Sequence, residues 1–177
     1  SWFKDVIDAG LPEPRACVLG TSLPSMRIMT LKDVTQAGFD FDTSYESEKA
    51  RQFERNPGCA LLFPWQALGR QVRVEGRIVK LDEQRSDLYF SARPRNSQLS
   101  AWAWNQSDVL ADRDEMERRM SRTVERFPEE VGRPPHWGAY RVVPDVVEFW
   151  QARPGMLHDR IRYRCSDGRW RAERLAP

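Results

Sequence analysis

The sequence predicts an α+β fold, an antiparallel barrel or sandwich with helices around it. Strand-like runs occupy both ends of the chain, while helical runs fill the middle, roughly residues 82 to 127. A chain of 177 residues can bury one sizeable core, so we expect a single domain over residues 1–177. No GxGxxG, Walker or GxSxG motif occurs, so the usual dinucleotide, nucleoside-triphosphate and serine-hydrolase sites have no support.

The first half of the chain is typical of one amphipathic helix followed by short strands. The helix covers residues 1–9 and is stopped by Gly10 and Pro12. Expected strands cover 15–21, 26–32, 38–43, 58–65 and 70–81, and a short helix covers 46–56. The linker 22–24 is short for a hairpin and lacks the glycine or Asn-Gly signal that such a turn usually carries.

The second half begins with helices and returns to strands. Asp82 caps a helix that is broken at Pro94, and a second helical stretch covers 96–104. Asp112 and Glu115 form a capping-box pattern for a charged helix that runs to Phe127. Expected strands cover 137–143, 146–151, 157–165 and 170–175, and the last two are joined by a hairpin turn at 166–169.

Composition excludes several classes of protein. The 28 basic and 26 acidic residues give a net charge of +2, which argues against a dedicated nucleic-acid binder. No apolar run approaches about 18 residues and no signal-peptide pattern opens the chain, so we expect no membrane span. Cys17, Cys59 and Cys165 are far apart and accompany only two histidines. This pattern argues against a metal site or a disulfide framework and favours a reducing cytoplasm.

Two segments place cations where an anion could bind. In a strand over 27–32, Arg27 and Lys32 face opposite sides, a pattern that also suits solvated surface charges. The segment 43–49 leads from a strand into a helix, with hydroxyls and Lys49 in the first turn. Free N–H groups and the positive end of the helix dipole would favour an anion there. Hydroxyl caps occur on most helices, so this second signal is weak alone.

A third candidate site combines a phenol, a guanidinium and a hydroxyl. Tyr89 and Arg93 lie four residues apart and share one helix face, and the break at Pro94 lets Ser97 return toward the same point. The three groups together suit one phosphate, although a helix end with exposed arginines fits the pattern equally well. His158, beside Asp159 near a strand, is a fourth candidate, for which a structural role is the commoner alternative.

Taken in order, these segments resemble the pyridoxine (pyridoxamine) 5′-phosphate oxidase family. The match runs from about Glu13 to Pro177, and its most specific parts are 70–76, 91–98, 148–151 and 157–160. The resemblance implies an antiparallel split β-barrel with surrounding helices, acting as a homodimer with FMN at the subunit interface. Residues 134–177 would complete the barrel and the dimer site.

The activity implied by this resemblance is oxidation of pyridoxamine or pyridoxine 5′-phosphate to pyridoxal 5′-phosphate. A hydride passes from the substrate's C4′ carbon to flavin N5, and O₂ then reoxidises the flavin to give H₂O₂. The family's cofactor positions fall on Arg27, Ile28, Met29, Thr30, Lys32, Asp42, Thr43, Lys49, Gln71, Gln106, Ser107, Trp150 and Arg160. Its substrate positions fall on Lys32, Tyr89, Arg93, Ser97 and His158. The candidate catalytic residues, His158 and Arg160, would act as positioning groups.

Three positions depart from the family pattern. Met156 stands where the family usually has an arginine that packs on the substrate ring. Glu48 replaces a common arginine, and Asp42 replaces a common tyrosine. Either carboxylate would weaken phosphate binding if it faced the anion. Two alternatives therefore stay open: a flavin oxidase retuned to another aromatic substrate, and a non-catalytic protein that binds FMN or pyridoxal phosphate.

Overall fold

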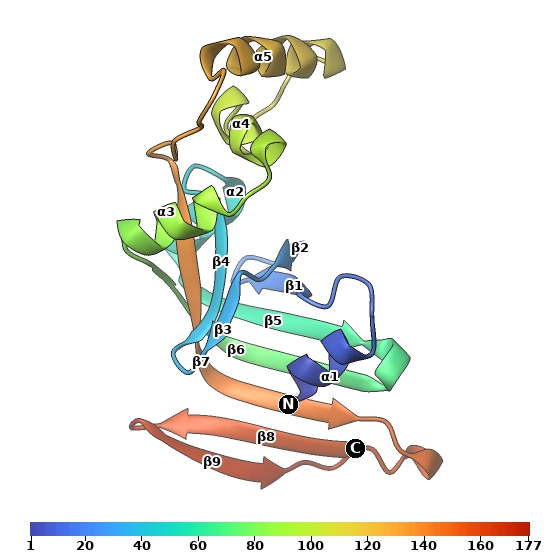
Figure 1. The fold of residues 1–177 in the computed structure, drawn as a ribbon. Helices are drawn as coiled ribbons and strands as arrows, with labels where there is room; N and C mark the ends of the chain where they lie inside the picture. The colour runs from blue at the N-terminus through green and yellow to red at the C-terminus, as the bar shows by residue number, and fades with distance from the viewer.

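The computed structural model describes residues 1–177, and its strands form a single curled antiparallel sheet (Figure 1). The strands are β1 (Ala16–Thr21), β2 (Ser25–Thr30), β3 (Asp33–Thr35), β4 (Gly38–Ser44), β5 (Gly58–Trp65), β6 (Arg70–Lys80), β7 (Trp137–Gln151), β8 (Asp159–Ser166) and β9 (Arg169–Arg174). The helices are α1 (Trp2–Asp8), α2 (Glu48–Arg55), α3 (Glu83–Ser91), α4 (Arg95–Ala103) and α5 (Arg113–Arg126), with short 3₁₀ turns η1 (Gln66–Leu68) and η2 (Pro154–Met156). The strand order is β2-β1-β5-β6-β7-β4-β3, with β8 also on β7 and β9 beside β8. The expected α+β class is confirmed.

Strand β7 joins the two ends of the sheet. It pairs with β6 from Tyr140 to Gln151, with β4 over its first residues and with β8 over its last. The sequence predicted two strands here, 137–143 and 146–151, and that prediction is wrong because the strand continues through Pro144. A β-bulge opposite Glu75 and Gly76 absorbs the irregularity. Gly76 is required at this bulge, since a Cβ there would lie 2.1 Å from the carbonyl oxygen of Val143.

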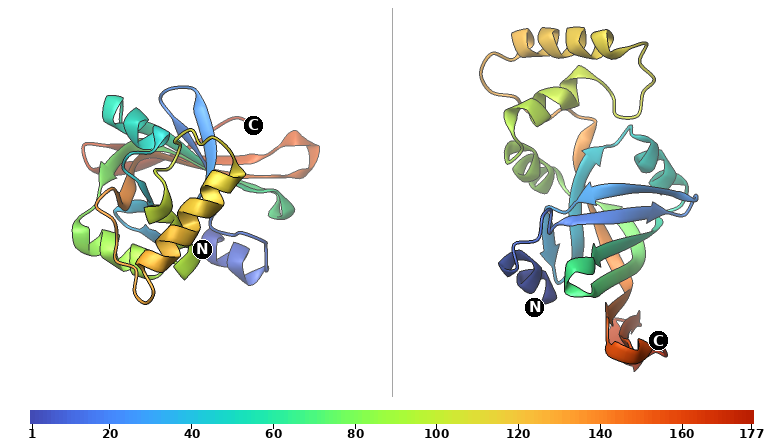
Figure 2. Two further views of the ribbon diagram at one scale, coloured as in Figure 1. Left: turned by 90° about the horizontal axis from the view of Figure 1, so that it is seen from above. Right: turned by 90° about the vertical axis from the view of Figure 1, so that its right-hand side faces the viewer.

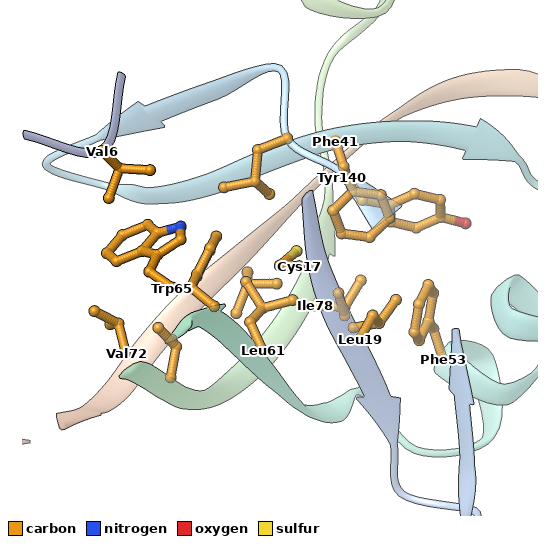
Figure 3. Packing of buried hydrophobic residues seen from close by; sticks show 14 of the residues in the cluster. Val6, Cys17, Leu19, Phe41, Phe53, Leu61, Trp65, Val72, Ile78 and Tyr140 are labelled. Carbon is orange, nitrogen blue, oxygen red and sulfur yellow. The ribbon is translucent and has the colours of Figure 1, made fainter. Parts of the chain in front are cut away.

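The barrel interior is filled by alternate side chains of the curled strands (Figure 3). The buried cluster comprises Val6, Cys17, Leu19, Leu31, Phe41, Ala50, Phe53, Leu61, Phe63, Trp65, Val72, Val74, Ile78, Tyr140 and Val142. Tyr140 and Phe41 stack at a centroid distance of 5.9 Å, and α1 contributes Val6 from one side. Each large aliphatic or aromatic side chain buried in this way contributes about 1.5–3 kcal/mol to the stability of the fold. The sheet stays curled because only a curled sheet encloses this cluster.

The helices begin where the sequence places their caps. The Asp82 carboxylate accepts from the Arg85 amide at the start of α3, and the Asp112 carboxylate accepts from the Glu115 amide at the start of α5. Both cap predictions are confirmed. Helices α4 and α5 pack on one another at the end of the molecule opposite β8 and β9 (Figure 2). None of the helices is both long enough and apolar enough to cross a membrane.

The two end hairpins differ in how their turns are made. The hairpin turn predicted at 166–169 is confirmed, and Asp167 and Gly168 have left-handed backbones there, at φ 52° and 72°. The linker 22–24 also closes a hairpin, with Thr21 paired to Ser25, although it contains no glycine. The Thr21 hydroxyl supports this turn by donating to the Leu23 carbonyl at 2.9 Å.

Candidate functional site

A buried ammonium at the start of α2 has no negatively charged partner. Lys49 is 6% exposed, and its Nζ donates to the Thr43 hydroxyl at 3.1 Å. Thr43 in turn donates to Gln106 Oε1 at 2.8 Å, and the neighbouring Ser107 hydroxyl accepts from the Glu48 amide. No carboxylate lies within ion-pair distance of Lys49. Burial lowers the pKa of Lys49 to about 8, with a further contribution from the positive charge of Arg27.

Arg27 is a second uncompensated cation beside the same helix. Its guanidinium donates to Ser25 Oγ at 2.8 Å and to Gln52 Oε1 at 3.2 Å, and no carboxylate pairs with it. Glu48 is exposed and accepts from Gln52 Nε2, so its carboxylate lies at the rim. Two neighbouring cations without a counter-anion are a candidate anion site. The phosphate of FMN fits this site, because it would supply the missing negative charge.

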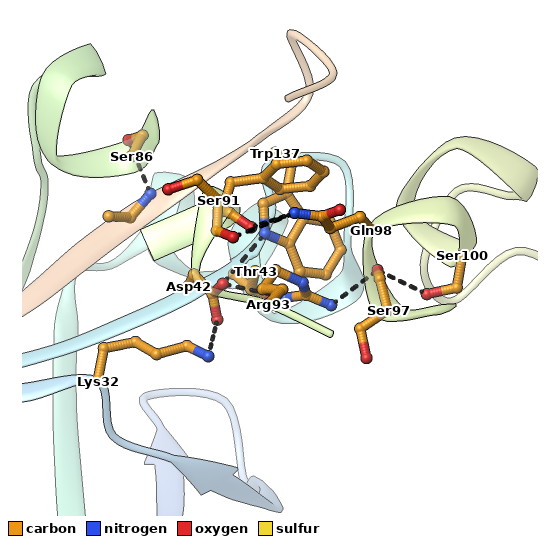
Figure 4. Close-up of polar contacts among 12 residues, drawn as sticks. Lys32, Asp42, Thr43, Ser86, Ser91, Arg93, Ser97, Gln98, Ser100 and Trp137 are labelled. Atoms are coloured by element: carbon orange, nitrogen blue, oxygen red, sulfur yellow. Dashed lines mark hydrogen bonds and ion pairs between the residues drawn. The ribbon is translucent and has the colours of Figure 1, made fainter. Parts of the chain in front are cut away.

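The residues expected to hold a substrate phosphate form a different cluster, in which an anion is already present (Figure 4). The Asp42 carboxylate lies 3.0 Å from Arg93 Nη1 and 3.6 Å from Lys32 Nζ. The Arg93 guanidinium also lies over the Trp137 ring at 4.3 Å and donates to the Ser97 carbonyl at 3.2 Å. The structure thus brings Lys32, Arg93 and Ser97 together. Arg93 Nε is buried with no partner, which leaves one donor for a ligand.

Tyr89 lies close by, but its phenol is engaged elsewhere. It donates to the fully buried carboxylate of Asp40 at 2.8 Å, and Arg141 holds the same carboxylate through two hydrogen bonds. Burial, together with this hydrogen bond, raises the pKa of Tyr89, so the phenol keeps its proton. Sequence reasoning missed Asp40 and Arg141. The alternation of Asp40 and Asp42 along β4 was the available signal, since both point from one face of that strand.

The remaining candidate residues gather at the other end of the sheet. Gln71 pairs with Trp150 across β6 and β7, and both line a cavity of about 300 Å³. Trp150 contacts His158 at a ring-centroid distance of 4.8 Å. His158 Nδ1 accepts from the Arg153 amide at 3.1 Å, so the neutral ring carries its proton on Nε2.

Arg160 is held in place by a buried carboxylate. Its Nε donates to Glu148 Oε1 at 2.8 Å, while Arg73 donates to the other oxygen at 3.0 Å. Glu148 is 4% exposed, so its charge is stabilised by these two guanidiniums. Sequence analysis singled out Glu148 only as part of a motif. Its anchoring role follows from the β7–β8 pairing, which places it beside Arg160.

Met156 lies in the exposed turn η2 that precedes His158. Its φ is 62°, next to Gly155 at 66°, and its side chain is 73% exposed. The left-handed backbone costs a residue with a Cβ about 1 kcal/mol, whichever side chain it carries. The turn therefore sets the direction of residue 156 independently of the change from arginine to methionine.

One protomer does not bring the two groups of candidate residues together. Thr43 pairs with Gly138 near the start of β7, whereas Gln71 pairs with Trp150 near its end. These positions are twelve residues apart, or roughly 40 Å along an extended strand. In Figure 1, α2 and the start of β8 lie near opposite ends of β7. Strand β2, with Ile28 exposed and Met29 packed on the core, lies at an edge of the sheet.

Comparison with known protein families identifies both halves of the chain. Residues 3–126 match the family model described as pyridoxamine 5′-phosphate oxidase. Residues 137–177 match the model described as the pyridoxine 5′-phosphate oxidase C-terminal dimerisation region.

Similar proteins with assigned names span the whole chain. The pyridoxine/pyridoxamine 5′-phosphate oxidase of Acaryochloris marina is 47% identical over 182 residues, covering 100% of this chain and 83% of that protein. The protein of the same name from Burkholderia thailandensis is 49% identical over 183 residues, covering 99% of this chain and 86% of that protein. Both alignments include the anion site and the β7–β8 region.

Solved structures confirm the expected split-barrel fold. PhzG from Burkholderia lata 383, in complex with tetrahydrophenazine-1-carboxylic acid, is 28% identical with a TM-score of 0.94, covering 99% of this chain and 89% of that one. A pyridoxamine 5′-phosphate oxidase-related, FMN-binding protein from Nostoc punctiforme is 17% identical with a TM-score of 0.80, covering 99% and 95%. The second likeness bears on the fold alone.

Proposed function

Because this chain belongs to the pyridoxamine 5′-phosphate oxidase family of oxidoreductases, whose cofactor is FMN, we propose that it oxidises pyridoxamine and pyridoxine 5′-phosphates to pyridoxal 5′-phosphate. Two electrons and two protons pass from the substrate to O₂, which gives H₂O₂. With pyridoxamine 5′-phosphate, a water molecule is also consumed and ammonia is released. The proposal places the enzyme in pyridoxal phosphate synthesis in a reducing cytoplasm, which suits three cysteines that form no disulfide.

The observation that carries the proposal is the uncompensated pair of cations at α2. Arg27 and Lys49 would bind the FMN phosphate, with hydroxyls of Thr43 and Ser107 beside them. When bound, FMN supplies the two-electron acceptor chemistry that the side chains of the protein lack. The protein's part is to hold the cofactor and to orient the substrate over it.

We propose that a second copy of the chain completes each site. Gln71, Trp150 and Arg160 are expected at the flavin ring, and they lie far from the phosphate end within one protomer. A homodimer that places the β7–β8 end of one protomer against α2 of its partner would reunite the two groups. The dimerisation region at 137–177 contains Trp150 and Arg160, which supports this arrangement. We further propose that residues 134–177 complete both the barrel and the dimer site.

On the substrate side, Lys32, Arg93 and Ser97 are proposed to hold the phosphate, with Tyr89 beside them. His158 would lie over the pyridine ring, positioned by the Arg153 amide and by Trp150. Arg160 is fixed by Glu148, so it can orient the ring without moving a proton. No strong general base is required, because the substrate gives up a hydride.

A second candidate function rests on Met156 and on the PhzG likeness. An exposed methionine in place of arginine removes a cation from the substrate's ring. The crystal structure of PhzG, which is similar to this chain, holds tetrahydrophenazine-1-carboxylic acid. The same scaffold therefore also serves an oxidase with a different ligand. The alternative is therefore a flavin oxidase that acts on a different aromatic ring.

One experiment separates these functions. FMN-loaded protein is made anaerobic, pyridoxine 5′-phosphate is added, and the flavin absorbance is followed. Bleaching, with pyridoxal 5′-phosphate formed after air is restored, is the expected result. Persistent colour despite bound FMN would overturn the proposed substrate.

A further inference from the structure

The two candidate phosphate sites of this protein differ in charge. At α2, Lys49 and Arg27 have no carboxylate partner. In the substrate cluster, the Asp42 carboxylate already contacts both cations, Arg93 at 3.0 Å and Lys32 at 3.6 Å. The side chain of Asp42 is 7% exposed, so water screens these contacts little. One site is open to an anion, and the other holds an anion that belongs to the chain itself.

The other donors of the substrate cluster are also partly engaged. Trp137 Nε1 points at Asp42 Oδ2 from 3.5 Å. Tyr89 has a single hydroxyl proton, which it donates to Asp40, so it cannot donate to a substrate at the same time. Figure 4 shows Asp42 between Lys32 and Arg93, with Ser97 on the far side of the guanidinium.

A substrate phosphate would have to share these cations with Asp42. Phosphate monoesters carry a charge of about −1.5 to −2 at pH 7, because their second pKa is about 6. Two cations and one carboxylate leave a net charge of only +1 to receive that dianion. The phosphate would also meet the like charge of Asp42 at close range, in a site where few waters intervene.

We propose that Asp42 is a specificity-determining residue that competes with the substrate's phosphate for Lys32 and Arg93. This inference rests on the proposed function, because it assigns the cluster to the phosphate end of the substrate. It adds a prediction about selectivity between phosphorylated and unphosphorylated substrates. The enzyme gains little affinity from the phosphate group, so phosphorylated and unphosphorylated forms of the same ring bind with similar strength.

The test compares ligand binding by wild type and Asp42→Asn, both loaded with FMN that has been photochemically reduced beforehand so that no ligand can pass a hydride to it. Binding is measured anaerobically by calorimetry at pH 8. The ligands are pyridoxine 5′-phosphate, pyridoxine and inorganic phosphate; with FMN bound, the α2 site is filled and only the substrate cluster is free. In wild type, the phosphorylated ring is expected to bind less than about tenfold more tightly than pyridoxine. In Asp42→Asn this ratio is expected to rise by at least about tenfold, equivalent to about 1.4 kcal/mol.

Asp87→Asn is the matched control, because Asp87 lies on α3 and pairs with Arg133 outside the cluster. Asp42→Glu keeps the charge and tests whether a change of shape alone alters binding. Thermal melting and FMN content verify that each variant is folded. If Asp42→Asn does not fold, the wild-type ratio still decides, since a preference above about a hundredfold for the phosphorylated ring would overturn the proposal.

The outcomes also separate this inference from the proposed function. Tighter binding of inorganic phosphate by Asp42→Asn, with no binding of either pyridoxine ligand, would uphold the role of Asp42 and refute the vitamin B6 substrate. Oxidation of pyridoxine 5′-phosphate with identical phosphate affinities in wild type and Asp42→Asn would uphold the substrate and refute the role of Asp42.

Discussion

The Lys49 ammonium donates to the Thr43 hydroxyl at 3.1 Å, and no carboxylate neutralises its charge. Burial of an ammonium without a counter-anion is unfavourable, which accounts for the lowered pKa of Lys49. A fold keeps such a group when a ligand supplies the missing charge. The relationship between these two residues is therefore the physical basis for our proposal that the FMN phosphate binds at α2.

Replacing Lys49 with methionine is expected to weaken FMN binding by about tenfold to a hundredfold, while the apoprotein stays folded. A hydrogen bond to a charged group contributes about 1.5–3 kcal/mol, and a factor of ten corresponds to about 1.4 kcal/mol. Quenching of flavin fluorescence on titration of the apoprotein measures the change. Lys4→Met should leave the affinity unaltered, and an equal loss in both variants would remove Lys49 from the site.

The affinity for FMN is expected to fall as pH rises above about 8. Burial lowers the pKa of Lys49 to about 8, so the free site loses its ammonium above that pH, and binding should then weaken by up to about tenfold per pH unit. The same pKa shift makes the free energy of unfolding of the apoprotein rise as the pH rises from 8 to about 10.5. In this window the unfolded chain still holds the Lys49 proton that the folded chain has released.

Titrations at several pH values, read by flavin fluorescence, test this expectation. Lys49→Met should show no such dependence, because it has no proton to lose at that position. A wild-type profile that stays flat from pH 7 to pH 10 would contradict it.

Glu148→Gln is expected to destabilise the protein by about 2–3 kcal/mol and to lower activity. Glu148 is the shared partner of Arg160 and Arg73, and its loss leaves Arg160 without a carboxylate and Arg73 with only its half-exposed pair to Glu75. This cost lies below the roughly 3–5 kcal/mol of a fully buried broken pair, because both arginines are partly exposed. Urea unfolding gives the stability. Glu75→Gln, which removes a half-exposed ion pair to the same Arg73, should cost less than about 0.5 kcal/mol.

Met156→Arg is expected to raise the rate of anaerobic flavin bleaching by pyridoxine 5′-phosphate without changing stability. Methionine and arginine both carry a Cβ, so the left-handed backbone at φ 62° costs the same with either side chain. The added guanidinium can polarise and stack on a pyridine ring. Stopped-flow absorbance follows the rate, and thermal melting follows the stability. A faster rate for another aromatic substrate in wild type, lost in Met156→Arg, would instead favour the retuned oxidase.

Local rules predicted most of the elements and their caps, because periodicity and capping depend on neighbouring residues. Asp82 and Asp112 cap their helices as expected, and β5 has the predicted bounds. Pro144 misled the prediction, since the missing N–H of a proline usually ends a strand, whereas here a bulge opposite Gly76 accommodates it. The three-residue strand β3 was too short to show a period.

The candidate site was harder to predict, because its contacts join distant parts of the chain. The resemblance gave the positions of Lys32 and Arg93, but only the structure shows that Asp42 lies between them. Likewise, nothing local to Tyr89 indicates that its phenol donates to Asp40, a residue 49 positions earlier. Such pairings depend on how α3 packs against β4, which spacing along the sequence does not encode.

In the proposed dimer, the length of β7 would make cofactor retention depend on protein concentration. If the residues beside Thr43 and those beside Trp150 meet only across the dimer, a protomer that leaves its partner opens both flavin sites at once. Dissociation of the dimer and release of FMN are then linked equilibria, and each must shift the other by the same factor. Dilution of the protein should therefore release FMN, and added FMN should stabilise the dimer against dissociation.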